Sequence, residues 1–97
     1  MISAEIKNEL ETISQKIEYN TATVKDYMRY EELLKFGGLT HTYIFSYLRK
    51  AGFGSWEEFY HARQQKENRT DTEAKVVGGL IGLGLGILLL SLFSSND

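Results

Sequence analysis

The chain has 97 residues, a formal net charge of −2, and neither cysteine nor proline. A chain of this length forms one small domain with a modest core, and the lack of cysteine excludes a disulfide framework or a thiolate metal site. The slightly negative charge argues against a protein that binds polyanions over its whole surface, although residues 20–69 are mildly basic.

The first predicted element is an amphipathic helix within residues 1–19. Its apolar residues recur every three or four positions and so lie on one stripe: Ile2, Ile6, Leu10, Ile13 and Ile17. Ser3 is placed to cap the first turn. We expect the stripe to be an interface, either with the chain's own domain or, as a coiled-coil seam, with another copy. No signal-peptide pattern opens the chain, so we expect the fold to stay where it is made.

Residues 20–63 are predicted to form a helical bundle domain, which begins with a second helix. Thr23 is a suitable N-cap, and the pair Gly37 and Gly38 is expected to end the helix because the chain must turn there. The expected apolar face of this helix comprises Val24, Tyr27, Met28, Tyr30, Leu34 and Phe36.

A third helix is predicted to start near Thr40 or Thr42 and to end at Gly52, with Ile44, Phe45, Leu48 and Ala51 buried. Two helices joined by a short glycine turn suit a helix-turn-helix. The residues that would contact DNA are then His41, Tyr43, Tyr47, Arg49 and Lys50, with Lys25 and Arg29 for phosphates. The alternative is that the two tyrosines lie at the rim of the core.

A fourth helix is predicted to start at Trp56. Ser55 and Glu58 have the spacing of a capping box, in which each side chain bonds a free backbone N–H at the helix start. Phe53, just before the cap, is placed to pack on a later aromatic residue such as Phe59. We expect Trp56 to lie in the core.

The run Phe53-Gly54-Ser55-Trp56, followed by acidic and then aromatic residues, resembles the core of the short helical repeats found beside homing endonucleases. Those repeats are regarded as DNA-binding modules, so the resemblance implies a helical fold and a DNA partner. The helix that precedes Phe53 here is longer than in those repeats.

The rest of the chain divides into a polar linker or stalk (64–72), a transmembrane helix (73–93) and a short tail (94–97). The uncharged run 76–93 has about 18 residues and as a helix reaches about 27 Å, close to the hydrocarbon thickness of a thin bilayer. The basic residues flanking this run precede it, namely Arg63, Lys66, Arg69 and Lys75. The positive-inside rule therefore predicts a tail-anchored, single-pass protein with a cytoplasmic N-terminal domain.

Three glycines in this run, Gly78, Gly82 and Gly86, recur every four residues and line one face of the helix, which we call the glycine ridge. Small residues at this spacing let two membrane helices approach closely, as in a glycine zipper. The ridge therefore predicts a homo-oligomer or a membrane protein partner. No ionisable residue lies within 76–93, which disfavours a proton or ion relay.

No pattern typical of catalysis, of a metal or cofactor, or of a small-molecule substrate is present. His41 and His61 have no carboxylate or thiol at ligand spacing, and no phosphate-binding glycine loop is present. We expect an all-α fold: a small bundle of about four short helices, helix-turn-helix-like, plus one C-terminal transmembrane helix.

Two functions fit this organisation. The first is a non-enzymatic binding module, anchored in the lipid bilayer, that tethers DNA or a protein partner to the membrane. The second is a structural small membrane protein of a multimeric assembly, such as a virion membrane, pore or secretion complex, that associates through the glycine ridge. A third, less favoured hypothesis is a membrane-disrupting, holin-like protein.

Overall fold

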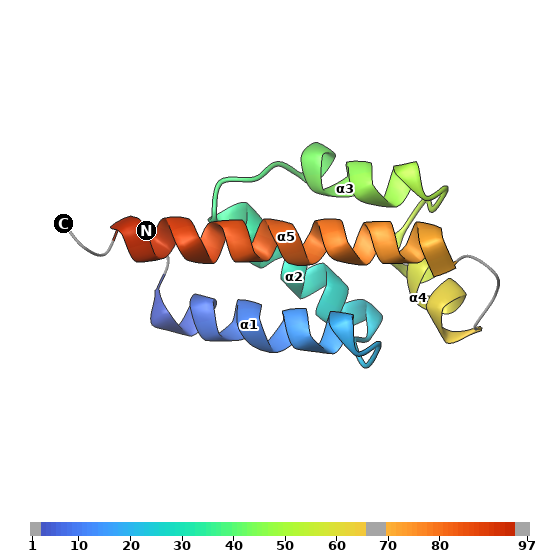
Figure 1. Ribbon diagram of the computed structural model, residues 1–97, viewed down its shortest axis with the longest axis horizontal. Coiled ribbons are helices and arrows are strands. Elements are labelled where there is room, and N and C mark those ends of the chain that lie inside the picture. The colour runs from blue at the N-terminus through green and yellow to red at the C-terminus, as the bar shows by residue number, and fades with distance from the viewer. Residues whose placement is uncertain (1–2, 66–69, 95–97) are drawn as a thin grey trace.

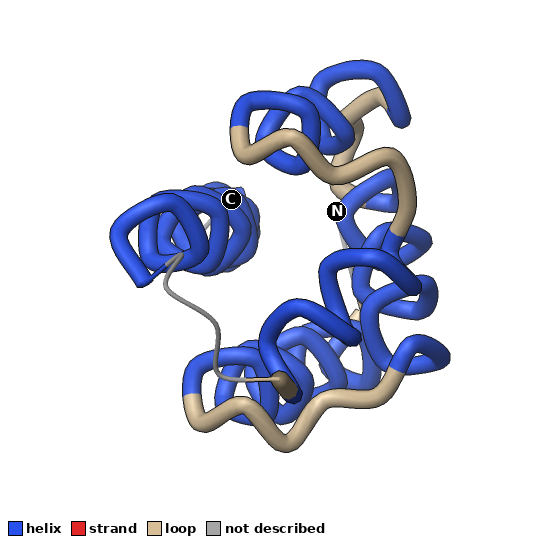
Figure 2. Tube along the Cα trace, turned by 90° about the vertical axis from the view of Figure 1, so that its right-hand side faces the viewer, coloured by secondary structure: helices blue, strands red, loops and turns tan. Residues whose placement is uncertain are grey.

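The computed structural model describes the backbone of residues 3–65 and 70–94 and the side chains of residues 3–65 and 73–90. Within these residues all regular structure is helical, as predicted: α1 (Ala4–Glu18), α2 (Val24–Phe36), α3 (His41–Lys50), α4 (Trp56–Gln64) and α5 (Thr70–Ser94). α1 and α3 run alongside α5 in the opposite direction (Figure 1). Seen along the long axis, α1 to α4, which we call the bundle, form an arc around one side of α5 (Figure 2).

Each helix of the bundle begins at a hydroxyl side chain that accepts a hydrogen bond from a backbone N–H in the first turn. The capping residues are Ser3, Thr23, Thr40 and Ser55, with N···O distances of 3.1–3.3 Å. These caps confirm the predictions and select Thr40 over Thr42 as the start of α3. Local sequence therefore sets where each of these helices begins.

The capping box is found at a different helix from the one predicted. At α2, the Asp26 carboxylate accepts a bond from the Thr23 N–H at 2.9 Å and completes the reciprocal pair. At α4, the Glu58 carboxylate accepts from the N–H of Gly54 instead of that of Ser55. The chain enters α4 through Gly54, so the free N–H nearest to Glu58 lies one residue earlier.

Left-handed backbone closes three of the helix connections. Gly38 (φ 103°) and Gly52 (φ 86°) end α2 and α3, as predicted, because glycine adopts this region without a steric penalty. Asn20 (φ 59°) does the same after α1. Its side chain donates to the carbonyl of Arg63 at 3.4 Å, which ties this turn to the end of α4.

The apolar stripe of α1 packs on the chain's own domain, the first of the two predicted alternatives. Leu10, Ile13 and Ile17 are buried in the common core, and Ile6 is half-buried against it. α1 contacts both α2 and α5. From Ile6 to Ile17 the stripe is therefore occupied within one copy of the chain, while Ile2 lies outside the described residues.

Aromatic side chains join α2 to α4. Tyr27 stacks on Trp56 with ring centroids 5.4 Å apart, and Phe59 meets Tyr27 edge-on at 5.5 Å. Phe53 packs edge-on against Phe59 at 5.3 Å, as the predicted staple requires. Burial of these rings supplies much of the stability of a domain this small.

The predicted apolar face of α2 is wrong at two residues. Met28 and Phe36 are 55% and 61% exposed, whereas Leu33, which the prediction omitted, is fully buried. The buried side of α2 is centred on Tyr30, so residues about 100° to 200° round the helix, such as Met28 and Phe36, point to solvent.

α5 is one continuous helix and is long and apolar enough to cross a membrane. Within the part of α5 whose side chains the structure describes, Glu73–Leu90 has a mean hydropathy of 1.8 over 18 residues. A core helix of a soluble protein can have the same composition, but only 28% of this stretch is buried within the chain. The rest of the stretch is half-buried or exposed.

Candidate functional site

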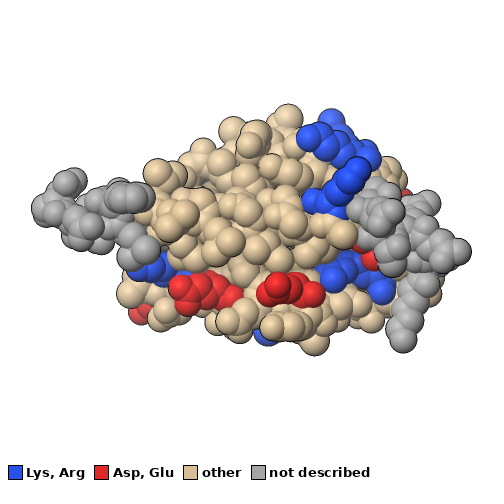
Figure 3. Space-filling model, viewed as in Figure 1, with Lys and Arg blue, Asp and Glu red and all other residues tan. Residues whose placement is uncertain are grey.

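The two sides of α5 differ in their surroundings. Val76, Leu80 and Ile87 are buried against the bundle. On the other side Leu85 and Leu89 are 54% and 56% exposed. The space-filling view shows a broad uncharged band over α5, with charged side chains at its margins (Figure 3). α5 thus presents a broad apolar surface, whereas scattered single apolar residues are what a soluble protein normally exposes.

A polar contact fixes the buried side of α5. The Tyr30 hydroxyl of α2 donates to the Leu80 carbonyl at 3.1 Å and also bonds the Ser14 hydroxyl of α1 at 2.9 Å. Burial raises the pKa of the Tyr30 phenol, although the bond with Ser14 acts in the opposite direction. Because a buried hydroxyl needs a partner, this contact specifies one position of α5 along the bundle.

Two glycines of α5 allow the bundle to approach its backbone. A Cβ added at Gly84 would overlap the Tyr30 hydroxyl, and one added at Gly79 would overlap the Tyr47 ring. Sequence reasoning missed this role: Gly79 and Gly84 are five residues apart, so they lie on different faces and show no periodic signal. Only the positions of α2 and α3 reveal what they contact.

The glycine ridge lies on the open side. A Cβ added at Gly78, Gly82 or Gly86 would meet no atom of another element within 4 Å among the described residues. In this part of the chain the three glycines that the sequence singled out are therefore not used for packing. They remain accessible to another helix.

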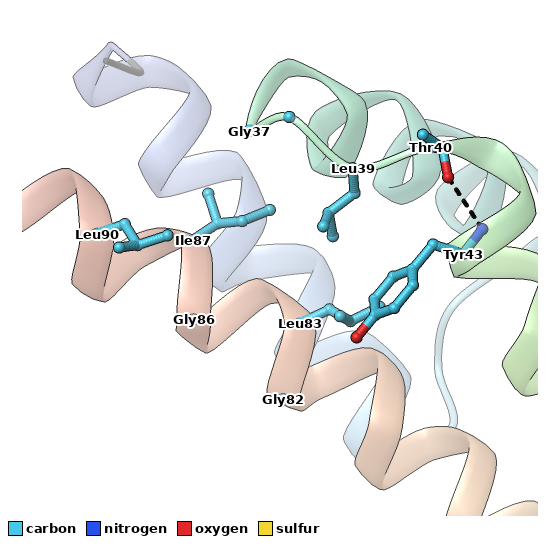
Figure 4. A pocket seen from close by; sticks show the side chains of 10 residues that line it. Gly37, Leu39, Thr40, Tyr43, Gly82, Leu83, Gly86, Ile87 and Leu90 are labelled. Atoms are coloured by element: carbon cyan, nitrogen blue, oxygen red, sulfur yellow. Dashed lines mark hydrogen bonds between the residues drawn. The ribbon is translucent and has the colours of Figure 1, made fainter.

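An apolar groove of about 400 Å³ runs between the ridge and the connection from α2 to α3. Leu39 and Tyr43 form one wall, and Leu83, Ile87 and Leu90 form the other (Figure 4). Gly82 and Gly86 form its floor. The groove is open and continuous with the exposed face of α5.

Two of the predicted DNA contacts are engaged within the chain. The Arg29 guanidinium bonds both carboxylate oxygens of Glu9, at 2.6 and 3.0 Å, and lies 3.5 Å from Glu32. His41 Nδ1 lies 2.8 Å from a carboxylate oxygen of Glu31. Both side chains thus hold helices together in the structure.

The other candidates lie on α3 and at the start of α2. Tyr47 packs on α5 and meets Tyr43 edge-on at 6.2 Å, which matches the alternative of a core-rim position for Tyr47. Arg49 and Lys50 are exposed, each over an aromatic ring of α3. Lys25 is also exposed. The structure leaves these three cations, with the half-exposed Tyr43, at the surface.

The residues that carry the homing-endonuclease-repeat resemblance have structural roles. Ser55 caps α4, and Phe53 and Trp56 are buried. The Trp56 indole donates to a Glu31 oxygen at 3.0 Å. Each of these contacts contributes to folding whether or not DNA is bound.

Comparison with known proteins returned no match: no family model fits the sequence, and no curated protein or solved structure is significantly similar to the chain. Among the residues that the structure describes, no group of three or more His, Asp or Glu side chains is placed to hold a metal ion.

Proposed function

We propose that the chain is a non-enzymatic, membrane-anchored binding module in which α5 enters the bilayer and the bundle stays at the cytoplasmic surface. The observation that carries the proposal is the exposed, uncharged face of α5, which includes Leu85 and Leu89. A face of this size is unfavourable in water and favourable in hydrocarbon.

The orientation rests on charge. The basic residues Arg63, Lys66, Arg69 and Lys75 all precede the apolar run, and the positive-inside rule keeps such a flank in the cytoplasm. Because the chain has no cysteine, single Ser3→Cys and Ser95→Cys variants can be tested with a membrane-impermeant maleimide. In intact bacterial spheroplasts Ser95→Cys should be labelled and Ser3→Cys only after lysis. The reverse pattern, or labelling of neither variant in the membrane fraction, would refute the orientation or the anchor.

A protein partner is favoured over DNA for the bundle. Arg29 and His41, two of the expected contacts, already pair with carboxylates, and the surface has both signs of charge. A duplex-binding assay on the full chain in detergent decides between them. DNA binding would weaken steeply with salt and would fall in an Arg49→Ala, Lys50→Ala variant, but not in Lys7→Ala. Absence of binding at low salt would exclude the DNA version.

The second candidate, a structural subunit of a multimeric membrane assembly, is favoured by the open glycine ridge. Gly82→Ile would fill the ridge and should reduce the oligomer to smaller species in detergent, measured by light scattering. Leu85→Ile, which leaves the ridge unchanged, is the matched control. If Gly82→Ile leaves the oligomer size unchanged, the ridge is not the contact.

A further inference from the structure

The position of α5 against the bundle is incompatible with a membrane-spanning position. α1 lies alongside α5 and carries many charges: Glu5, Lys7, Glu9, Glu11, Lys16 and Glu18. Charged side chains are strongly disfavoured in the hydrocarbon core. The bundle therefore cannot accompany α5 into a bilayer while these contacts persist.

The contacts that hold α5 are specific. The Tyr30 hydroxyl reaches the Leu80 carbonyl, and the bare backbone at Gly79 and Gly84 receives the rings of Tyr47 and Tyr30. A helix that was merely collapsed onto an apolar surface would not need a buried hydroxyl bond or glycines at these contacts. The bundle is thus a shaped receptor for α5.

From these observations we propose that the bundle is an autoinhibitory receptor for α5, which holds the helix in the lipid-free chain and must release it before the helix can span a membrane. The proposal rests on the proposed membrane function. In the docked form the bundle covers only one face of α5, so the exposed leucines can meet a bilayer surface first. On insertion, lipid then replaces the bundle around the face of α5 that the bundle had covered.

A reversible lock tests the proposal. A Cβ added at Gly79 would lie 3.2 Å from Tyr47 Cγ. Because the sulfur of a cysteine occupies the γ position, this distance suits a disulfide between Tyr47→Cys and Gly79→Cys. The measured quantity is the fraction of chain that stays in phosphatidylcholine vesicles after alkaline extraction. This fraction should be at least tenfold smaller for the oxidised double variant than for the same protein after reduction. Because both states have one sequence, a difference cannot come from misfolding of the variant. Equal resistance of the oxidised and reduced forms would overturn the proposal.

Matched substitutions provide the second measurement. Gly84→Leu and Gly82→Leu add the same apolar side chain, but only the first overlaps Tyr30. Overpacking of this size should raise the ratio of inserted to free chain on the order of tenfold for Gly84→Leu relative to Gly82→Leu. Equal insertion of the two would contradict the proposal. If neither variant nor the reduced double-cysteine chain inserts at all, the membrane function itself fails.

Discussion

Glu31 connects three helices of the bundle, and its replacement by glutamine is the sharpest test of the fold. Its carboxylate accepts bonds from Trp56 Nε1 at 3.0 Å and His41 Nδ1 at 2.8 Å, and Lys35 Nζ lies 3.2 Å away. Burial raises the pKa of the Glu31 carboxyl, but these hydrogen bonds outweigh it and hold the pKa below the ordinary value of 4.5. The group is therefore more acidic in the folded chain than in the unfolded chain.

The magnitude follows from what Glu31→Gln removes. The amide oxygen of glutamine can still accept the Trp56 bond. What is lost is the negative charge of the Glu31 carboxylate, which strengthens its contacts with His41 and Lys35. The His41 and Lys35 side chains are 53% and 46% exposed, which limits the Lys35 ion pair to about 0–1 kcal/mol. The hydrogen bond that His41 donates to the ionised carboxylate contributes somewhat more. We expect a loss of about 1–2 kcal/mol in the free energy of unfolding at pH 7.

The pH dependence has a definite sign. A carboxyl with a lowered folded-state pKa contributes stability that is present above 4.5 and is lost as the pH falls through the folded-state value. The difference between wild type and Glu31→Gln should therefore shrink in acid, because protonated Glu31 resembles glutamine.

Urea unfolding followed by the fluorescence of Trp56, the single tryptophan, measures the difference at neutral and acidic pH. Glu11→Gln, an exposed change of the same charge on α1, should alter stability by less than about 0.5 kcal/mol. A Glu31→Gln chain as stable as wild type at pH 7, or a difference that grows in acid, would refute the reasoning.

Three other substitutions probe the packing of α2, the cap of α4 and the bonds of Arg63, all by urea unfolding. Leu34→Ala should cost about 2–5 kcal/mol and Met28→Ala less than about 0.5, since only Leu34 is buried; equal costs would contradict the described face of α2. Ser55→Ala should cost about 1 kcal/mol, and no loss would mean that the hydroxyl is not the cap. Arg63→Met keeps the apolar stem but removes bonds of 2.6 and 3.0 Å to α1 and α2, for about 1–3 kcal/mol; a cost no larger than that of the exposed Arg49→Met would show these bonds to be unimportant.

Much of the local structure could be predicted from short-range patterns. The caps at Ser3, Thr23 and Ser55 depend on a hydroxyl and an N–H three residues away, so neighbouring residues contain the whole interaction. The turns at Gly38 and Gly52 depend on backbone sterics of a single residue. The stripe of α1 repeats from turn to turn, and the burial of Leu10, Ile13 and Ile17 is confirmed.

The packing of α2 and the use of the cations could not be predicted with the same success. Met28 and Leu33 are both apolar, and the difference in their burial comes from which side of α2 meets α1, α3 and α4. Arg29 was predicted to contact phosphates, but in the structure its guanidinium bonds Glu9, twenty residues earlier. Interactions at this sequence separation depend on how the helices cross, which no local pattern records.

The sequence alone predicts that α5 is a long apolar helix. It also predicts the glycine ridge, because residues at this spacing share one face of any α-helix. Which glycines the chain itself would use was decided by the tertiary structure. Gly79 and Gly84 receive tyrosine rings from two other helices, while the ridge stays open. Periodicity shows which residues share a face, but only the packed bundle determines which face is covered.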